Sequence, residues 1–349
     1  MTEPHKKKYD NAAMAVVTGI RDLFKTKEVC GELKETDRLE GKTVFIDGAS
    51  SGLGFAIAVD VAKRGGRVIM ACRSGLPEKG EKVKRLSGNS DVHMLHVDLS
   101  DISSIRHLVS GITKLSTHPD IYILNAGIVP KKSRRTPQGL EEMFMVNYFA
   151  KFVFIRMLME HRLILDPGSL ILGKPNQHPE PSIQKPASTL DPRPSRIIFV
   201  TSESHRNPEN YNWDGFGKYK DYGIKQSMEL YGYYKLLLVT FARELSRRLN
   251  SDSKTITSVF AMCPGPVNSN IAREAPKIFQ PLLKLIFAIF FKSPKEAAKP
   301  VVYLAASPDV EGKSFDYLFL MSRQEIDKKA ADPENGERLW ELSEKLLKI

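Results

Sequence analysis

A tyrosine and a lysine spaced for acid–base chemistry stand in the segment YGYYK, residues 231–235. The segment continues as LLLVTFARELSRRL, a helical pattern, so Tyr231 and Lys235 at positions i and i+4 share one helical face. A free phenol has a pKa of about 10, and a neighbouring cation stabilises its phenolate form. The pair is therefore a candidate general acid or base. A YxxxK spacing also arises by chance, and Tyr233 and Tyr234 leave open a plain aromatic packing face.

A glycine-rich turn, DGASSGLG at residues 47–54, follows a short apolar strand and opens a helix. A dinucleotide pyrophosphate needs such a turn, because the backbone must approach the phosphates and helix N-terminal amides must face them. The strand–turn–helix context therefore predicts a dinucleotide site, although a tight strand-to-helix connection is the simpler alternative. The candidate cofactor-binding residues in this turn are Gly48, Ser50, Ser51, Gly52, Leu53 and Gly54.

The next predicted strand ends in ACRS, with Arg73 at the place where an NAD(H) site usually carries Asp or Glu. An arginine there suits the 2′-phosphate of NADP(H). The sequence thus favours NADP(H) over NAD(H), unless Arg73 is only a solvated surface charge.

Two further strands end in VDLS and LNAG. Ligands of open α/β sheets bind at the carboxyl ends of the strands, so both segments are candidate cofactor-binding sites, although each is also a plain turn signal. Their candidate residues are Asp98, Leu99, Asn125, Ala126 and Gly127.

From Gly41 onward, short apolar strands alternate with amphipathic helical patterns. This alternation predicts an α/β fold with a Rossmann-type doubly wound, mostly parallel sheet and helices on both faces. The predicted strands cover residues 42–47, 67–72, 92–99, 121–127, 196–202 and 255–265.

The domain organisation predicted from this pattern is a single Rossmann-type domain over residues 41–349 with two added segments. Residues 1–40 carry an amphipathic run and form a predicted N-terminal helical extension, packed on the main domain or lying on acidic lipid. Residues 166–195 contain seven prolines, which exclude a helix or central strand and predict a surface insertion.

The composition bounds the class of protein. The 349 residues are 42% hydrophobic, which excludes a wholly disordered chain, and they lack the Gly-X-Y period of a collagen. The net charge of +11 suits anionic partners. Three isolated cysteines indicate a reducing compartment and no structural zinc. We find no signal peptide, no spanning segment, no metal-ligand spacing and no nucleic-acid-binding motif, so we expect a cytoplasmic protein, with peripheral contact to acidic membrane left open.

Together these segments resemble the short-chain dehydrogenase/reductase superfamily, and most closely its retinol dehydrogenase-like branch. The order is that of the superfamily: glycine-rich turn, VDLS, LNAG, a helical Asn, a Ser after the fifth strand, YxxxK and PGPV, over roughly residues 41–345. The branch is indicated by ACRS, TSESHR, the segment around YGYYK, and GERLWELSEKL.

The resemblance implies an NADP(H)-dependent oxidoreductase that interconverts an apolar alcohol and its aldehyde or ketone. Tyr231 would be the general acid or base, and Lys235 would lower its pKa and bind the nicotinamide ribose. Ser202 would hold the substrate oxygen, and Asn147 would hold a water in the proton relay. The residues implied around the nicotinamide are Pro264, Gly265, Val267 and Ser269.

The resemblance also implies a substrate class. The apolar stretch at residues 278–291 would cover an apolar substrate such as a retinoid, a steroid or a lipid aldehyde, while core packing and membrane contact are the alternatives. The oligomeric state is left open.

Some positions depart from the family pattern. Asp47 stands where Thr is usual, and its carboxylate would either weaken cofactor binding or be neutralised by a nearby base. Tyr234 replaces a small residue and would crowd the nicotinamide side, and SFDY at 314–317 replaces a glycine-containing turn. These departures motivate the alternative of a catalytically silent NADP(H)-binding sensor or scaffold. A dehydratase or epimerase of the same fold is a further alternative.

Overall fold

The computed structural model describes residues 29–164, 195–250, 255, 257–266 and 292–348. Several expectations fall outside these residues: the amphipathic run of the N-terminal extension, the proline-rich insertion, the apolar stretch 278–291, Val267 and Ser269.

The described residues form one eight-stranded sheet in the order β3-β2-β1-β4-β5-β6-β7-β8. Neighbouring strands are parallel except for β7 and β8, which pair antiparallel. The strand order reverses direction between β1 and β4, and such a switch point is where ligands bind in doubly wound sheets. The strands are β1 (Thr43–Asp47), β2 (Arg67–Cys72), β3 (Val92–His96), β4 (Ile121–Leu124), β5 (Ser195–Val200), β6 (Thr257–Cys263), β7 (Phe315–Phe319) and β8 (Ser322–Gln324).

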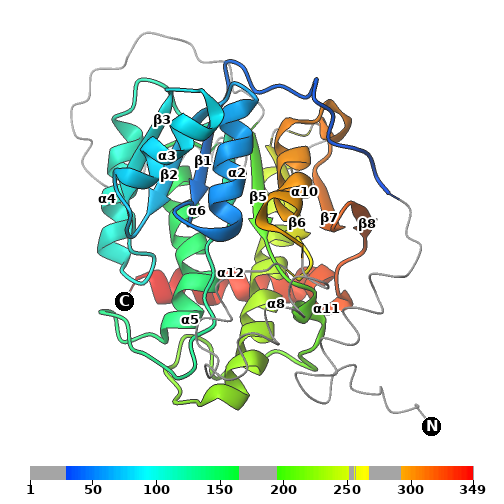
Figure 1. The fold of residues 1–349 in the computed structure, drawn as a ribbon. Coiled ribbons are helices and arrows are strands. Elements are labelled where there is room, and N and C mark those ends of the chain that lie inside the picture. Colours follow the sequence, from blue (N-terminus) through cyan, green and yellow to red (C-terminus); the bar gives the residue numbers. More distant parts are fainter. Residues whose placement is uncertain (1–28, 165–194, 251–254, 256, 267–291, 349) are drawn as a thin grey trace, which may run out of the picture.

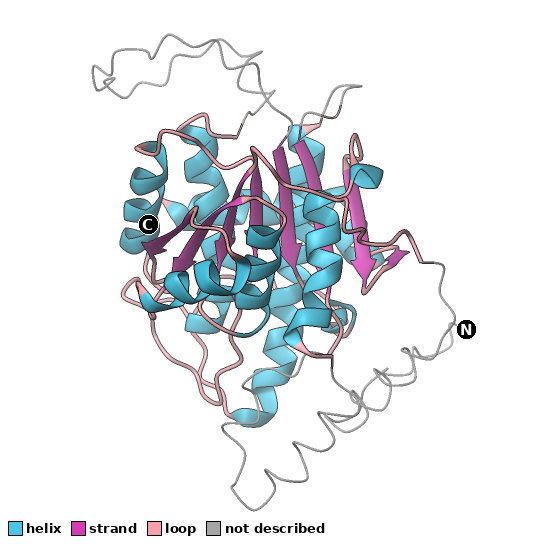
Figure 2. Cartoon of the chain, turned by 45° about the horizontal axis from the view of Figure 1, so that its top comes forward, coloured by secondary structure: helices cyan, strands magenta, loops and turns pink. Residues whose placement is uncertain are grey.

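Helices cover both faces of the sheet (Figure 2). Successive residues of a strand point to opposite faces, so Phe45 of β1 lies in one apolar core while Val44 and Ile46 lie in the other. The Rossmann-type prediction is confirmed. The longer helices are α2 (Gly52–Lys63), α3 (Glu78–Ser87), α4 (Ile102–Thr113), α6 (Ala150–Glu160), α8 (Ile224–Leu249), α10 (Pro294–Ala306) and α12 (Pro333–Leu347). The short ones are α5 (Glu142–Phe144), the π-helical turn η1 (Met145–Phe149), η2 (Glu203–Arg206), η5 (Pro308–Val310) and α11 (Lys328–Ala331).

The first six strands match the predicted ones, and the last two were not predicted. The segment SFDY, treated above as an altered turn, begins β7, which pairs in parallel with β6. Phe315 and Asp316 of β7 are only partly buried, so its first half lacks the continuous apolar run that marks the central strands.

The last helix, α12, lies across α6 and α8 (Figure 1). Its Trp340 ring meets the ring of Phe152 edge-on, with centroids 5.3 Å apart, and Phe152 meets Phe241 of α8 in the same way at 5.5 Å. The Tyr148 hydroxyl is 2.6 Å from the Ser343 hydroxyl. These contacts hold α8, which carries Tyr231 and Lys235, against α6, which follows Asn147.

Residues 29–40 contain no helix and run along the domain. The Cys30 amide donates to the Met321 carbonyl at 2.8 Å, and the Tyr303 hydroxyl donates to the Cys30 carbonyl at 3.2 Å. Further along, the Arg64 guanidinium donates to the Asp37 carbonyl at 2.7 Å. This segment therefore joins β8, α10 and α2.

Candidate active site

The glycine-rich turn after β1 needs glycine for steric reasons. Gly48 has a φ of +63°, and a Cβ there would lie 2.9 Å from the Ala126 Cβ. A Cβ on Gly54 would lie 2.4 Å from the Gly48 carbonyl oxygen. The turn is thus packed tightly against the residues that follow β4, with no room for side chains on its inner side.

The helix that the turn opens has an N-terminus suited to an anion. Ser51 is the N-cap residue of α2, yet its side chain makes no capping hydrogen bond, and the first turn holds no acidic residue. The first amides of a helix lack partners within the helix and carry a partial positive charge. The turn and these amides therefore fit a dinucleotide pyrophosphate.

The side chain of Arg73, directly after β2, is exposed. No carboxylate among the described residues pairs with it. After β3, the Asp98 carboxylate accepts hydrogen bonds from the Ser100 amide at 2.9 Å and the Ser100 hydroxyl at 2.7 Å. Leu99 is partly buried. The ends of β2 and β3 thus differ: the Arg73 guanidinium after β2 is exposed to solvent, whereas the Asp98 carboxylate after β3 is held by hydrogen bonds from Ser100.

Asp47 is neutralised by a nearby base, which is one of the two outcomes considered from the sequence. One carboxylate oxygen accepts hydrogen bonds from the amides of Asn125 at 2.5 Å and Ala126 at 2.6 Å. The other lies 3.3 Å from Nζ of Lys151, and both side chains are buried. The carboxylate therefore fastens the turn after β4 to the turn after β1.

Asn147 lies in the π-helical turn η1 and is fully buried. Its Oδ1 accepts from the Ile128 amide at 2.7 Å, and its Nδ2 donates to the Ile128 carbonyl at 2.9 Å. A Cβ on Gly127 would lie 3.1 Å from this Oδ1 and 3.6 Å from Nζ of Lys235. Asn147, Gly127 and Lys235 therefore converge at the end of β4, and π-helical turns are frequent at functional sites.

Lys235 is buried, and its Nζ donates to the carbonyl of Val200, the last residue of β5, at 3.0 Å. The same Nζ lies 5.6 Å from the centroid of the Tyr231 ring. Burial, together with the positive charge of Lys151, lowers the pKa of Lys235 to about 7.

Tyr231 is partly exposed to solvent. Burial of the phenol raises its pKa to about 12, and a side-chain hydrogen bond with Ser202 opposes that rise. The Lys235 ammonium is held on the Val200 carbonyl, and burial disfavours its charge. At neutral pH the phenol is therefore protonated, which is the form that can donate a proton.

Ser202 follows β5 and begins the short helix η2. Its neighbour Thr201 is buried and donates its hydroxyl to the Met262 carbonyl at 3.0 Å, and the Ser204 hydroxyl is buried without a partner among the described residues. Of these three hydroxyls, that of Ser202 is the one that acts on Tyr231, where it lowers the pKa of the phenol.

His205 was not singled out from the sequence, although it stands in the segment TSESHR. Its Nδ1 donates to the Ser202 carbonyl at 2.7 Å, and its Nε2 accepts from the Asp327 amide at 3.4 Å. The ring is fully buried against Tyr317, with centroids 5.3 Å apart. Burial lowers the pKa of His205 to about 4, so the neutral ring holds the serine loop against the segment after β8.

The remaining candidates lie at the end of β6 and on α8. Pro264 is buried, and Gly265 has a φ of +73°, where a Cβ would meet the Leu320 side chain at 2.7 Å. Tyr234 is buried and meets the Phe144 ring edge-on at 5.6 Å, so its contacts are those of a core packing residue.

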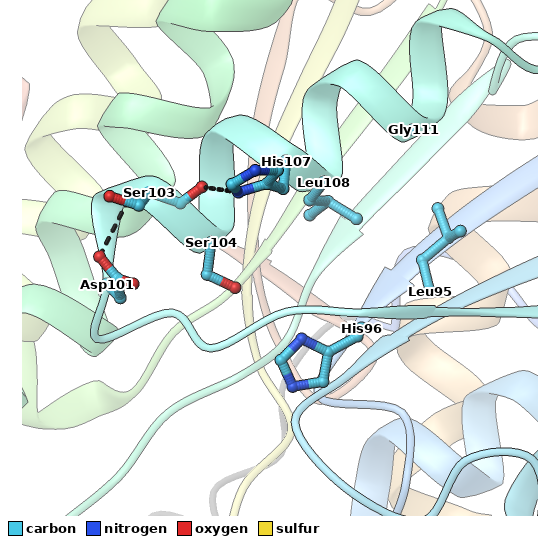
Figure 3. Close-up of a pocket in the computed structure, with 8 residues that line it drawn as sticks. All are labelled: Leu95, His96, Asp101, Ser103, Ser104, His107, Leu108 and Gly111. Carbon is cyan, nitrogen blue, oxygen red and sulfur yellow. Dashed lines mark hydrogen bonds between the residues drawn. The ribbon is translucent and has the colours of Figure 1, made fainter.

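A surface hollow of about 420 Å³ lies between β3 and α4 (Figure 3), next to Asp98, whose amide donates to the Ser104 hydroxyl at 2.9 Å. His96 and His107 line it, and Nδ1 of His107 is 2.8 Å from the Ser103 carbonyl oxygen. It shares no residue with the candidate site. Among the described residues no group of three or more His, Cys, Asp or Glu could hold a metal ion, and none of their helices is long and apolar enough to cross a membrane.

Comparison with known proteins agrees with this geometry. The sequence pattern of the short chain dehydrogenase family matches residues 42–172. Human retinol dehydrogenase 14 is 30% identical over 88% of this chain and 86% of its own length, and human retinol dehydrogenase 13 is 30% identical over 96% and 93%. An uncharacterized protein from Mycobacterium Paratuberculosis has a crystal structure that superposes with a TM-score of 0.63, at 26% identity over 91% of this chain and 98% of that one.

The chain therefore belongs to the short-chain dehydrogenase/reductase family. Within it, the chain is of the retinol dehydrogenase-like type, as the sequence resemblance predicted. It is thus an oxidoreductase of the alcohol/carbonyl kind, from a family that binds nicotinamide cofactors.

Proposed function

We propose that this protein is an NADP(H)-dependent oxidoreductase that interconverts an apolar alcohol and its aldehyde or ketone. The observation that carries the proposal is the convergence of Tyr231, Ser202, Lys235 and Asn147 beside the glycine-rich turn. The Ser202 hydroxyl lowers the pKa of Tyr231, and Nζ of Lys235 lies 5.6 Å from the centroid of the Tyr231 ring. Lys235 and Asn147 both lie beside Gly127. A proton donor, a carbonyl-orienting hydroxyl and a cation thus lie within one site.

Each residue has one role in the proposed reduction. The bound nicotinamide supplies the hydride. The hydroxyls of Ser202 and Tyr231 hold the carbonyl oxygen of the substrate, and Tyr231, protonated at neutral pH, gives its proton to that oxygen as negative charge develops. The Lys235 ammonium stabilises the phenolate that remains, and Asn147 fixes the backbone of Ile128 beside them.

The proposed cofactor preference rests on Arg73. The glycine-rich turn and the α2 N-terminus would hold the pyrophosphate, and Arg73 would pair with the 2′-phosphate.

The proposed substrate class rests on the relatives, two of which carry the name retinol dehydrogenase. An apolar carbonyl compound such as a retinoid, a steroid or a lipid aldehyde is therefore the proposed substrate.

The proposal is tested by the oxidation of enzyme-bound NADPH in a single turnover with a panel of apolar aldehydes. Tyr231→Phe is expected to lower the rate by about 10²-fold or more while NADPH affinity stays within about two-fold. Tyr233→Phe is the matched control, since that hydroxyl bonds to the Asn212 backbone instead. Tight NADPH binding without oxidation by any aldehyde would instead support the sensor or scaffold alternative.

A further inference from the structure

We infer that Ile224 and Met228 bind the apolar chain of the substrate and set a preference for long over short carbonyl compounds. The inference rests on the proposed function, because it needs a substrate carbonyl at Tyr231. It is carried by the surface of α8, where the face bearing the catalytic pair continues outward as exposed apolar side chains.

The four residues involved share one face of α8. Ile224, Met228, Tyr231 and Lys235 stand at positions i, i+4, i+7 and i+11, which fall on a single narrow stripe of an α-helix. At 1.5 Å of rise per residue, Ile224 lies about 10 Å along the axis from Tyr231. The stripe is thus long enough to support the extended chain of one small molecule.

The stripe runs from the sheet to solvent. At its inner end, Lys235 is 3% exposed and bonds to the carbonyl of Val200, where β5 ends. At its outer end, Met228 is 51% and Ile224 is 67% exposed. The glycine-rich turn and Gly127 lie at the inner end, so a substrate whose carbonyl reaches Tyr231 extends over the outer end.

The loop after β4 adds a third apolar side chain there. The Ser227 hydroxyl donates to the Pro130 carbonyl at 2.6 Å, which holds this loop beside the first turns of α8 (Figure 1). Val129, the residue before Pro130, is 36% exposed. Of five exposed large apolar residues in the described part of the chain, two therefore lie on the face of α8 that carries Tyr231, and a third lies in the loop that Ser227 holds against α8.

The occupant we assign to this surface is the apolar chain of the substrate, since the surface is continuous with the catalytic face. The probe is a series of straight-chain aldehydes from butanal to dodecanal, with kcat/KM measured in the presence of NADPH. For the wild type, kcat/KM should rise with chain length by up to about four-fold per buried methylene.

In Ile224→Asn/Met228→Ser, the ratio of kcat/KM for dodecanal to that for butanal should fall by about ten-fold or more, mainly through a higher KM for dodecanal. Met228→Leu should keep the ratio. Leu86→Asn, at an exposed apolar residue of α3, is the matched control and should also keep it.

An unchanged ratio in the double variant would overturn this inference and leave the proposed function standing. Loss of binding to anionic vesicles with an unchanged ratio would make the surface a membrane contact, and would overturn it as well. A wild type that reduces a retinoid or steroid carbonyl compound but no aldehyde of the series would overturn this inference alone. One that reduces none of these compounds would remove the proposed function as well.

Discussion

Nζ of Lys151 lies 3.3 Å from a carboxylate oxygen of Asp47, in the core between the first strand and the helix that follows Asn147. The other oxygen of the same carboxylate holds the amides of Asn125 and Ala126. A single buried ion pair therefore connects the glycine-rich turn, the end of β4 and the start of α6. Burial lowers the pKa of Lys151, and Asp47 opposes that lowering.

Removing one partner of this pair should destabilise the fold more than removing both. Lys151→Met leaves a buried carboxylate without its cation, and we expect the free energy of unfolding to fall by about 3–5 kcal/mol. Asp47→Asn/Lys151→Met keeps an acceptor for the two amides and should recover much of that loss. Urea unfolding of the wild type, both single variants and the double variant measures the coupling, and additive losses would contradict it.

Reduction should weaken as the medium becomes alkaline. Burial and the charge of Lys151 set the pKa of Lys235 to about 7, so its ammonium is present below that pH and lost above it. If the ammonium stabilises the phenolate of Tyr231, kcat/KM for NADPH should fall as pH rises through about 7. The profile of Lys235→Met, recorded at the same pH values, should be low and lack this inflection; a flat wild-type profile would argue against the role.

Gly54→Ala should impair dinucleotide binding, because the new methyl group would lie 2.4 Å from the Gly48 carbonyl oxygen and displace the turn. We expect the Kd for NADPH to rise by about ten-fold or more. Gly111→Ala in α4 is the control, since nothing lies within 4 Å of its added methyl group. Calorimetric titration of both variants decides the point, and equal affinities would remove the turn from the cofactor site.

Arg73→Asp should change the cofactor preference rather than the overall affinity. Loss of one charge-assisted contact to the 2′-phosphate should move the ratio of Kd for NADPH to Kd for NADH by about ten-fold or more. Arg106→Asp, at an exposed arginine of α4, alters the net charge equally and should leave the ratio unchanged. If both variants behave alike, the 2′-phosphate is bound by other residues.

His205 should make the fold sensitive to mild acid. Its pKa is about 4 in the folded protein and 6.5 for an unburied side chain, so the unfolded state takes up the proton first as pH falls below 6.5. The stability contributed by the neutral ring is complete above that pH and declines by about 3 kcal/mol as the pH approaches 4. The difference in unfolding free energy between wild type and His205→Asn should shrink over this window, and a constant difference would contradict the assignment.

The sequence was sufficient for features that are local along the chain. Six strands were apparent because each is a short apolar run followed by a turn signal, and Tyr231 and Lys235 were apparent from helical spacing alone. Each candidate site residue that the structure describes lies on an element of the predicted kind, at the end of a strand or on a helix.

The features that escaped prediction depend on pairing across long stretches of chain. Lys151 stands within an apolar helical pattern, and nothing local indicates that its partner is Asp47. His205 acts through the Asp327 amide, 122 residues away. The last two strands were missed because β8 has only three residues, and β7 depends on β6 for its burial.

The segment before β1 covers part of the sheet edge that β8 forms. The outermost strand, β8, is three residues long, and its Ser322 forms an antiparallel bridge with Val29. Unpaired backbone groups on an edge strand can pair with a strand of another chain. Short edge strands and segments that cover the edge limit this association. A chain that begins at Gly41 would lack both the Val29 bridge to Ser322 and the hydrogen bond from the Cys30 amide to the Met321 carbonyl. We therefore expect the shortened chain to self-associate more readily than the full chain.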